Sequence, residues 1–197
     1  MNITTDQIKE LRDSTGVSVM QCKKALEEAL GDMEKAKIIL RKISKLSADK
    51  KSERTLGAGT LVSYIHSNGT VGAMIELLCE TDFVARNEDF KALGRDLAMH
   101  IVAQAPEYLK IEDIPEEAKA TAKDLFTKEA DEEAQNKPQE IKDKIIEGKL
   151  NSYLKEKVLL DQAFIKNPEM TIKGLLDGAT QKFGERTEIG RFVRFSI

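Results

Sequence analysis

Two runs of alternating apolar residues, separated by an Asn-Gly dipeptide, constrain the fold of this chain more than any other feature. The first run spans Thr60 to His66 and the second spans Val71 to Leu78, with Asn68-Gly69 between them. Asn and Gly tolerate the positive φ angles of a tight hairpin turn, and alternation is typical of a strand with one buried face. The sequence therefore predicts an antiparallel β-hairpin.

The segment from Cys79 to Asn87, with the sequence CETDFVARN, follows the second predicted strand. Apolar residues then recur at helical spacing from Phe90 to Val102, so the segment forms the corner between a strand and a helix. Asp82 and Phe83 lie next to each other at this corner. A ring and a carboxylate on short, well-anchored backbone are suited to entering another molecule.

The residues of the corner alone leave a second interpretation open. Thr81, Asp82 and Asn87 are all good helix N-caps, and Phe83 can turn inward as a core residue. In that case the corner is purely structural. The choice between the two depends on whether the Phe83 ring is exposed.

Residues 1–45 contain three short helical patterns, each with a clear beginning. Thr4 and Gln7 have the spacing of a capping box, and Ser18 and Asp32 are N-caps for the second and third helices. Three helices of this length predict a compact bundle, which is small enough to be only marginally stable on its own.

Val19 and Met20 lie off the apolar stripe of the second helix, so we expect at least one of them to be exposed, beside Arg12. An exposed apolar pair near a cation is a candidate docking site. The ordinary alternative is that Val19 packs as a hydrophobic staple while Met20 is an isolated apolar surface residue.

The fold class that these patterns predict is α+β, in three parts. Residues 1–45 form the three-helix domain, the polar and basic residues 46–56 form a linker, and residues 57–197 form the core domain. The last run, Thr187 to Ile197, alternates again and completes a small three-stranded antiparallel sheet that helices cover on one face. If the other face is apolar, self-association would cover it.

Composition and charge exclude several classes of function. With 31 basic and 34 acidic residues the net charge is −3, which gives no global basic field for direct nucleic-acid binding. No apolar run approaches the roughly 18 residues of a membrane span, and no leader pattern begins the chain, so we expect a cytoplasmic protein. Cys22 and Cys79 have no metal-ligand spacing and are expected to be reduced, buried thiols, and we expect no cofactor.

Two motifs resemble the signatures of a known family. The sequence TDFVARN at Thr81 to Asn87, preceded by GAMIEL at Gly72 to Leu77, is similar to the signature of the bacterial translation elongation factor Ts family. IKELRDSTG at Ile8 to Gly16, followed by CKKAL at Cys22 to Leu26, resembles the N-terminal domain of that family in the same order and spacing. The similarity extends to FVRF at Phe192 to Phe195 and so covers essentially the whole chain.

This resemblance implies a non-enzymatic guanine-nucleotide exchange factor that binds elongation factor Tu with GDP. The residues that would enter the partner, dislodge its Mg²⁺ and release GDP so that GTP can bind are Thr81, Asp82, Phe83 and Val84.

The resemblance also implies that the N-terminal bundle is similar to ubiquitin-associated (UBA) domains. Arg12, Val19 and Met20 would dock it on elongation factor Tu, although the family pattern has Met where Val19 stands and an acidic residue where Gln21 stands. Short members of the family that resemble this chain are homodimers through the sheet.

Two other functions compete with this interpretation. A non-enzymatic adaptor could use the three-helix bundle to bind ubiquitin-like or nascent-chain partners, but this leaves the corner at Thr81 to Val84 without a role. An enzyme could use Cys79 as a nucleophile with a distant His, but nothing at the end of an apolar strand would activate that thiol.

Overall fold

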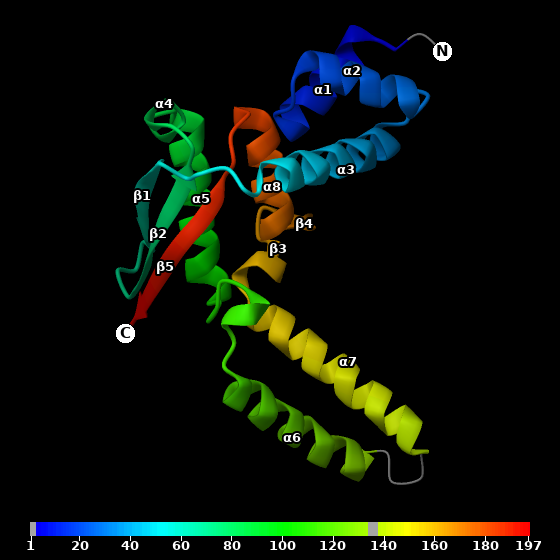
Figure 1. Cartoon of the computed structure of the whole chain (residues 1–197), viewed down its shortest axis with the longest axis vertical. Coiled ribbons are helices and arrows are strands. Elements are labelled where there is room, and N and C mark those ends of the chain that lie inside the picture. The colour runs from blue at the N-terminus through cyan, green and yellow to red at the C-terminus, as the bar shows by residue number, and fades with distance from the viewer. Residues whose placement is uncertain (1–2, 134–137) are drawn as a thin grey trace. The chain divides into compact units, whose positions relative to one another are not determined.

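The computed structural model describes residues 3–133 and 138–197 and has an α+β fold (Figure 1). The chain divides into two compact units, Met1–Val102 with Lys173–Ile197, and Ala103–Ile172. In chain order the elements are α1 (Thr5–Thr15), α2 (Val19–Glu28), α3 (Met33–Lys51), β1 (Ala58–Ile65), β2 (Val71–Cys79), α4 (Asp82–Ala85), α5 (Glu88–Gln104), the 3₁₀ helix η1 (Ile111–Asp113), α6 (Glu116–Glu133), α7 (Gln139–Lys157), the 3₁₀ helix η2 (Leu159–Asp161), β3 (Ala163–Phe164), β4 (Asn167–Thr171), α8 (Ile172–Phe183) and β5 (Glu188–Ser196).

The three predicted helix caps at the N-terminus are confirmed. Thr4 and Gln7 form the capping box, in which the Thr4 hydroxyl accepts the Gln7 N–H at 3.2 Å and Gln7 Oε1 accepts the Thr4 N–H at 3.0 Å. Ser18 caps α2, and Asp32 Oδ1 accepts the Lys35 N–H at 3.0 Å at the start of α3. These short-range contacts satisfy backbone donors that the first turn of a helix leaves free.

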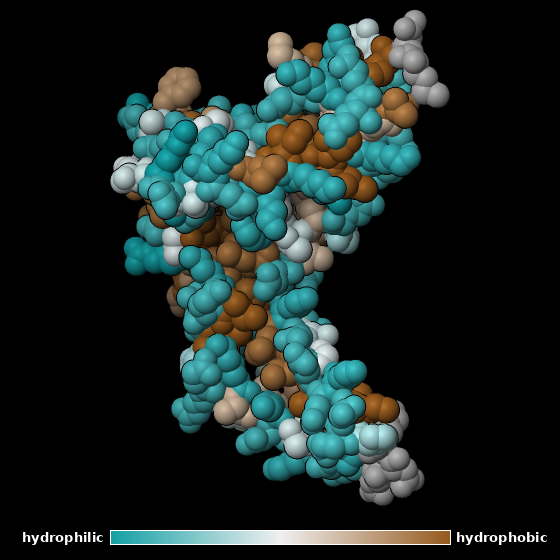
Figure 2. Space-filling view, turned by 45° about the vertical axis from the view of Figure 1, so that its right-hand side comes forward, coloured by the Kyte–Doolittle hydropathy of each residue, from teal (hydrophilic) through white to brown (hydrophobic). Residues whose placement is uncertain are grey.

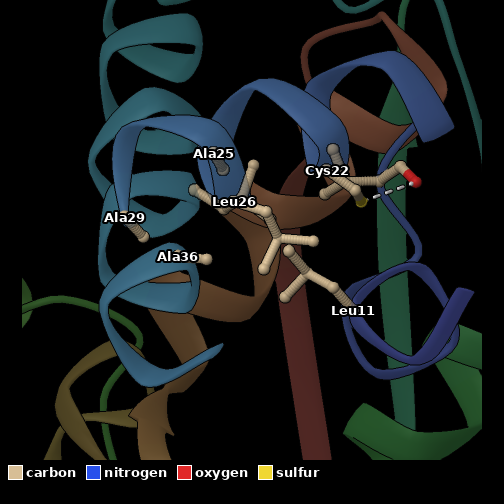
Figure 3. Packing of buried hydrophobic residues seen from close by; sticks show 8 residues of the cluster. Leu11, Cys22, Ala25, Leu26, Ala29 and Ala36 are labelled. Carbon is tan, nitrogen blue, oxygen red and sulfur yellow. Dashed lines mark hydrogen bonds between the residues drawn. The ribbon is translucent and has the colours of Figure 1, made fainter. Parts of the chain in front are cut away.

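Small side chains let α1, α2 and α3 pack closely around one core (Figure 3). The Cys22 thiol is part of this core and donates to the Val17 carbonyl oxygen at 3.6 Å. Figure 3 labels the buried residues Leu11, Cys22, Ala25, Leu26, Ala29 and Ala36.

The linker predicted at residues 46–56 begins too early, because α3 continues through Lys51. The residues are polar, but Lys, Leu and Ala are good helix formers, so polarity alone did not end the helix. Contacts with α8 and with the residue after it also hold this end of α3: the Ser44 hydroxyl bonds to Gln181 Oε1, and Lys51 Nζ donates to the Gly184 carbonyl oxygen at 2.8 Å. The division into domains 1–45 and 57–197 stays a prediction.

The predicted three-stranded antiparallel sheet is confirmed, with strand order β1-β2-β5. On its inner face Val62, Ile75 and Phe192 are aligned across the strands, and α5 lies along this face (Figure 1). Gly94 brings α5 against β1, since a Cβ atom there would lie only 2.7 Å from Val62 Cγ2. The close approach of helix and sheet therefore requires glycine.

The outer face of the sheet exposes several apolar side chains beside an ion pair, in which Arg191 Nε lies 3.5 Å from Glu76 Oε2. The register places Ser63, Met74 and Val193 in one row and Ile65, Gly72 and Phe195 in the next, with side chains on the same face. The exposed apolar residues of this outer sheet face are Leu61, Ile65, Met74, Val193 and Phe195.

The second unit contains α6 and α7, which pack against each other. Phe126 and Tyr153 meet edge to face with ring centroids 5.6 Å apart, and Lys142 pairs with Asp131 at 2.9 Å. A short hairpin of β3 and β4 follows. Asn167 and Pro168 are residue types that often form turns, but here they lie at the start of β4.

Candidate functional site

The corner between β2 and α5 contains a single helical turn, α4, that begins at a well-defined cap. Thr81 has an extended backbone, with φ −127° and ψ 155°, and its hydroxyl accepts the Val84 N–H at 3.5 Å. Asn87 Oδ1 accepts the Asp89 N–H at 2.8 Å just before α5. The N-cap roles expected of Thr81 and Asn87 are therefore present.

Phe83 projects from this corner, with 83% of its surface exposed. The next two residues, Val84 and Ala85, are buried and attach α4 to the core. The inward orientation of Phe83 that the residues alone left open is thus excluded. The structure gives Val84 an anchoring position, and its assignment to a contact surface stays a prediction.

Asp82 is exposed beside Phe83 and pairs with Arg86, with Oδ2 and Nη2 2.9 Å apart. Both side chains are mostly exposed to solvent. Exposed pairs of this kind stabilise a fold by about 0–1 kcal/mol, so an incoming protein can separate them at little cost. The corner therefore presents a ring, a carboxylate and a guanidinium together.

A group of side chains behind the corner was not identified from the sequence. Glu185, in the loop between α8 and β5, accepts the Glu80 N–H at 3.1 Å and the Thr81 N–H at 3.0 Å through Oε2. Its Oε1 accepts the Thr81 hydroxyl at 2.6 Å. Glu185 lies 104 positions from Thr81 in the chain, so no local pattern could have indicated the contact.

Glu80 is held by the same loop. Its Oε1 accepts the Arg186 N–H at 2.6 Å and lies 3.2 Å from Arg54 Nη1. The Arg186 N–H, and then the Arg54 guanidinium, lower the pKa of the Glu80 carboxyl below its usual value.

Cys79 does not have the properties of a nucleophile. Its side chain is fully buried, and its thiol donates to the Thr81 carbonyl oxygen at 3.2 Å. Burial, and then the Glu185 carboxylate, raise the pKa of the Cys79 thiol, which disfavours the reactive thiolate.

The candidate docking residues of the N-terminal helices are exposed. Val19 is 51% and Met20 69% exposed at the start of α2, which confirms the expectation that at least one of them faces solvent. Arg12 is also exposed. Burial raises the pKa of the neighbouring Cys22 thiol, and the positive charge of Arg12 partly opposes this increase. Figure 2 shows brown patches at the N-terminal helices, and a further brown band runs down the middle of this face.

Neither a metal-binding cluster nor a membrane-spanning helix is present in the part of the chain that the structure describes. No group of three or more His, Cys, Asp or Glu side chains in residues 3–133 and 138–197 could hold a metal ion. Among the helices in the same ranges, none combines the length and apolar character needed to cross a membrane.

Comparisons with known proteins agree with the motifs. The family model described as Elongation factor TS matches residues 2–197. The chain is 45% identical to elongation factor Ts of Coprothermobacter proteolyticus over 197 residues, which cover 100% of this chain and 99% of the relative. It is 47% identical to elongation factor Ts of Syntrophus aciditrophicus, again over 197 residues, covering 100% and 97% of the two chains.

The two kinds of comparison agree over the full length and place the chain among translation elongation factors. It belongs to the elongation factor Ts family.

Proposed function

We propose that this protein binds elongation factor Tu in its GDP form and promotes release of the nucleotide by inserting the corner at Asp82 and Phe83. The observation that carries the proposal is the exposure of the Phe83 ring on backbone that is fixed on both sides, by β2 and by the buried Val84 and Ala85. Exposed large aromatic residues on rigid supports are the usual anchors of protein interfaces. No covalent chemistry is involved, so the protein is not an enzyme.

Thermodynamic linkage between binding of the factor and binding of the nucleotide sets how much free energy the factor must supply. A factor that lowers the affinity of its partner for a nucleotide must itself bind more weakly to the nucleotide complex by the same ratio. Burying the Phe83 ring contributes roughly 1.5–3 kcal/mol, or about one to two decades of affinity at ~1.4 kcal/mol each. We propose that the remainder comes from the loss of the partner's Mg²⁺, which neutralises charge on the phosphates.

The three N-terminal helices would hold the partner while the corner acts. We propose that they are similar to UBA domains and dock through Arg12, Val19 and Met20, which are exposed at the start of α2 and the end of α1. Once the helices are bound, the corner is held at a high effective concentration near its own binding site. A weak contact at Phe83 can therefore still promote nucleotide release. The adaptor alternative uses these helices too, but it gives no role to the exposed Phe83.

Phe83→Ala tests the proposal directly. We expect the variant to fold normally, because the ring makes little contact with its own chain, and to slow GDP release from elongation factor Tu by about one to two decades. Stopped-flow fluorescence of a labelled GDP measures the rate. Leu125→Ala, which removes another exposed apolar side chain on α6, is the control and should leave the rate unchanged. An unchanged rate for Phe83→Ala would remove the corner from the mechanism.

Measuring the GDP release rate at increasing concentrations of the factor tests docking. The double variant Val19→Ser, Met20→Ser should raise the concentration of factor needed for half-maximal release and leave the maximal rate nearly unchanged. Deleting residues 1–50 is a poorer test, since it would also remove Ser44, whose hydroxyl bonds to Gln181 on α8.

We further propose that two copies associate through the outer sheet face. Its apolar residues are aligned by the strand register and exposed in the single chain, and contiguous exposed apolar surface usually marks an interface. A location in the cytoplasm, without direct contact with nucleic acid or membrane, follows from a role as exchange factor for elongation factor Tu.

A further inference from the structure

We propose that Glu185 is a positioning residue for nucleotide release, which fixes the corner that carries Phe83 although it does not touch the partner. The inference rests on the proposed function of Phe83 and adds the residue that orients it. Glu185 enters from a loop far away in the chain and binds the corner through three hydrogen bonds.

Glu185 accepts hydrogen bonds from backbone donors at the end of the sheet. The ladder between β1 and β2 ends at the pair Ala58 and Cys79, so the N–H groups of Glu80 and Thr81 lie just past the last strand pair. One carboxylate oxygen of Glu185 accepts both, at 3.1 and 3.0 Å. Hydrogen bonds to a charged acceptor are stronger than neutral ones, so they fix the direction in which the chain leaves the sheet.

Glu185 also binds the residue that caps α4. The Thr81 hydroxyl donates to Glu185 Oε1 at 2.6 Å and accepts the Val84 N–H at 3.5 Å. Glu185 therefore sets the orientation of the hydroxyl that begins the helical turn. Because Phe83 is the second residue of this four-residue turn, its direction depends on the same cap.

Hydrogen bonds from other segments hold the loop that carries Glu185. The Arg186 N–H donates to Glu80 Oε1 at 2.6 Å, and the Arg186 guanidinium donates to the Arg54 carbonyl oxygen at 2.5 Å. Lys51 Nζ donates to the Gly184 carbonyl oxygen at 2.8 Å. The loop is thus held by Glu80 just after β2, by Lys51 at the end of α3 and by Arg54 a few residues later, which makes Glu185 a fixed support.

Glu185→Ala and Glu185→Gln test the inference in the full-length protein. We expect both variants to lower the maximal rate of GDP release from elongation factor Tu, by at least about tenfold for Ala, which loses all three hydrogen bonds of Glu185 to the corner. The effect of Gln should be smaller, since its neutral amide oxygen can still accept the two backbone N–H groups that one carboxylate oxygen accepts now. The concentration for half-maximal release should change by less than about twofold, because the binding surfaces are intact.

A second measurement does not depend on the partner. In the free protein, amide hydrogen exchange at Glu80 and Thr81 should be about tenfold faster in Glu185→Ala than in the natural sequence. Circular dichroism and thermal unfolding establish that the variants are folded. Glu117→Gln removes an exposed carboxylate on α6 and is the matched control, with neither readout expected to change.

The outcomes separate this inference from the proposed function. If Phe83→Ala slows GDP release and both Glu185 variants support the normal maximal rate, the positioning role of Glu185 is wrong. The proposed insertion of Phe83 is then still supported. If the variants change only the half-maximal concentration, Glu185 acts on binding and the inference is also wrong. If Phe83→Ala has no effect on release, the proposed function fails together with the role that depends on it.

Discussion

Phe83 owes its exposure to the residues beside it. Val84 and Ala85 are buried, and successive side chains on one helical turn point in different directions, so anchoring the two residues turns the ring toward solvent. Side-chain type alone does not determine this. The sequence shows a Phe at a corner, but the choice between core and surface depends on which residue of α4 faces α5 and the sheet.

Gly94 illustrates a second constraint at the scale of one residue. We expect Gly94→Ala to destabilise the protein by about 1–3 kcal/mol, because the added methyl group would overlap Val62 and push α5 away from the sheet. Urea unfolding measures the change. Gly178→Ala on α8 is the control: a Cβ added there would meet no atom within 4 Å, so it should be neutral or stabilising by up to ~1 kcal/mol. Equal behaviour of the two variants would contradict the close approach of α5.

At the scale of elements, local contacts were predictable and distant ones were not. The hairpin, the caps at Thr4, Ser18 and Asp32, and the last strand depend on residues close together in the chain. The extension of α3 to Lys51 depends in part on contacts with Gln181 and Gly184, which are more than a hundred positions away. The motif resemblance identified the residues of the corner as a candidate site. The role of Glu185 could be identified only from the folded structure, because the residue lies far from the corner in the sequence.

The contact between Glu80, which follows β2, and the loop before β5 should make the stability of the fold depend on pH. The pKa of Glu80 is lower in the folded protein than its usual value, mainly because the Arg186 N–H donates to the carboxylate. A lowered pKa contributes stability above the unfolded pKa of about 4.3, and this contribution is lost as the pH falls through the folded value.

We therefore expect Glu80→Gln to be less stable than the natural protein at pH 7, with a difference that shrinks below about pH 4. Thermal unfolding between pH 7 and pH 3 measures it. Glu117→Gln, which removes an exposed carboxylate elsewhere, should show no such convergence. A stability difference that is constant across this range would mean that the charge of Glu80 contributes nothing to the contact.

At the scale of the whole molecule, the proposed contacts with other proteins use separate surfaces. The corner at Phe83 and the exposed residues of α2 would face elongation factor Tu. The outer sheet face lies on strands whose other side packs on α5. Self-association through this face therefore does not require the corner to be covered, and the two proposals can be tested separately.

The outer sheet face gives the test at this scale. Ile65 and Phe195 flank Gly72 across the strands and are 69% and 70% exposed, so a charge at either position would be buried if two sheets met. We expect light scattering of the natural protein to give twice the chain mass of 22.0 kDa. Phe195→Lys should give the mass of one chain, because burying an unpaired ammonium group costs several kcal/mol.

Leu125→Lys on α6 should remain at the mass of two chains. A natural protein that stays at the mass of one chain up to millimolar concentration would exclude the interface, and the outer sheet face would then have to be apolar for another reason.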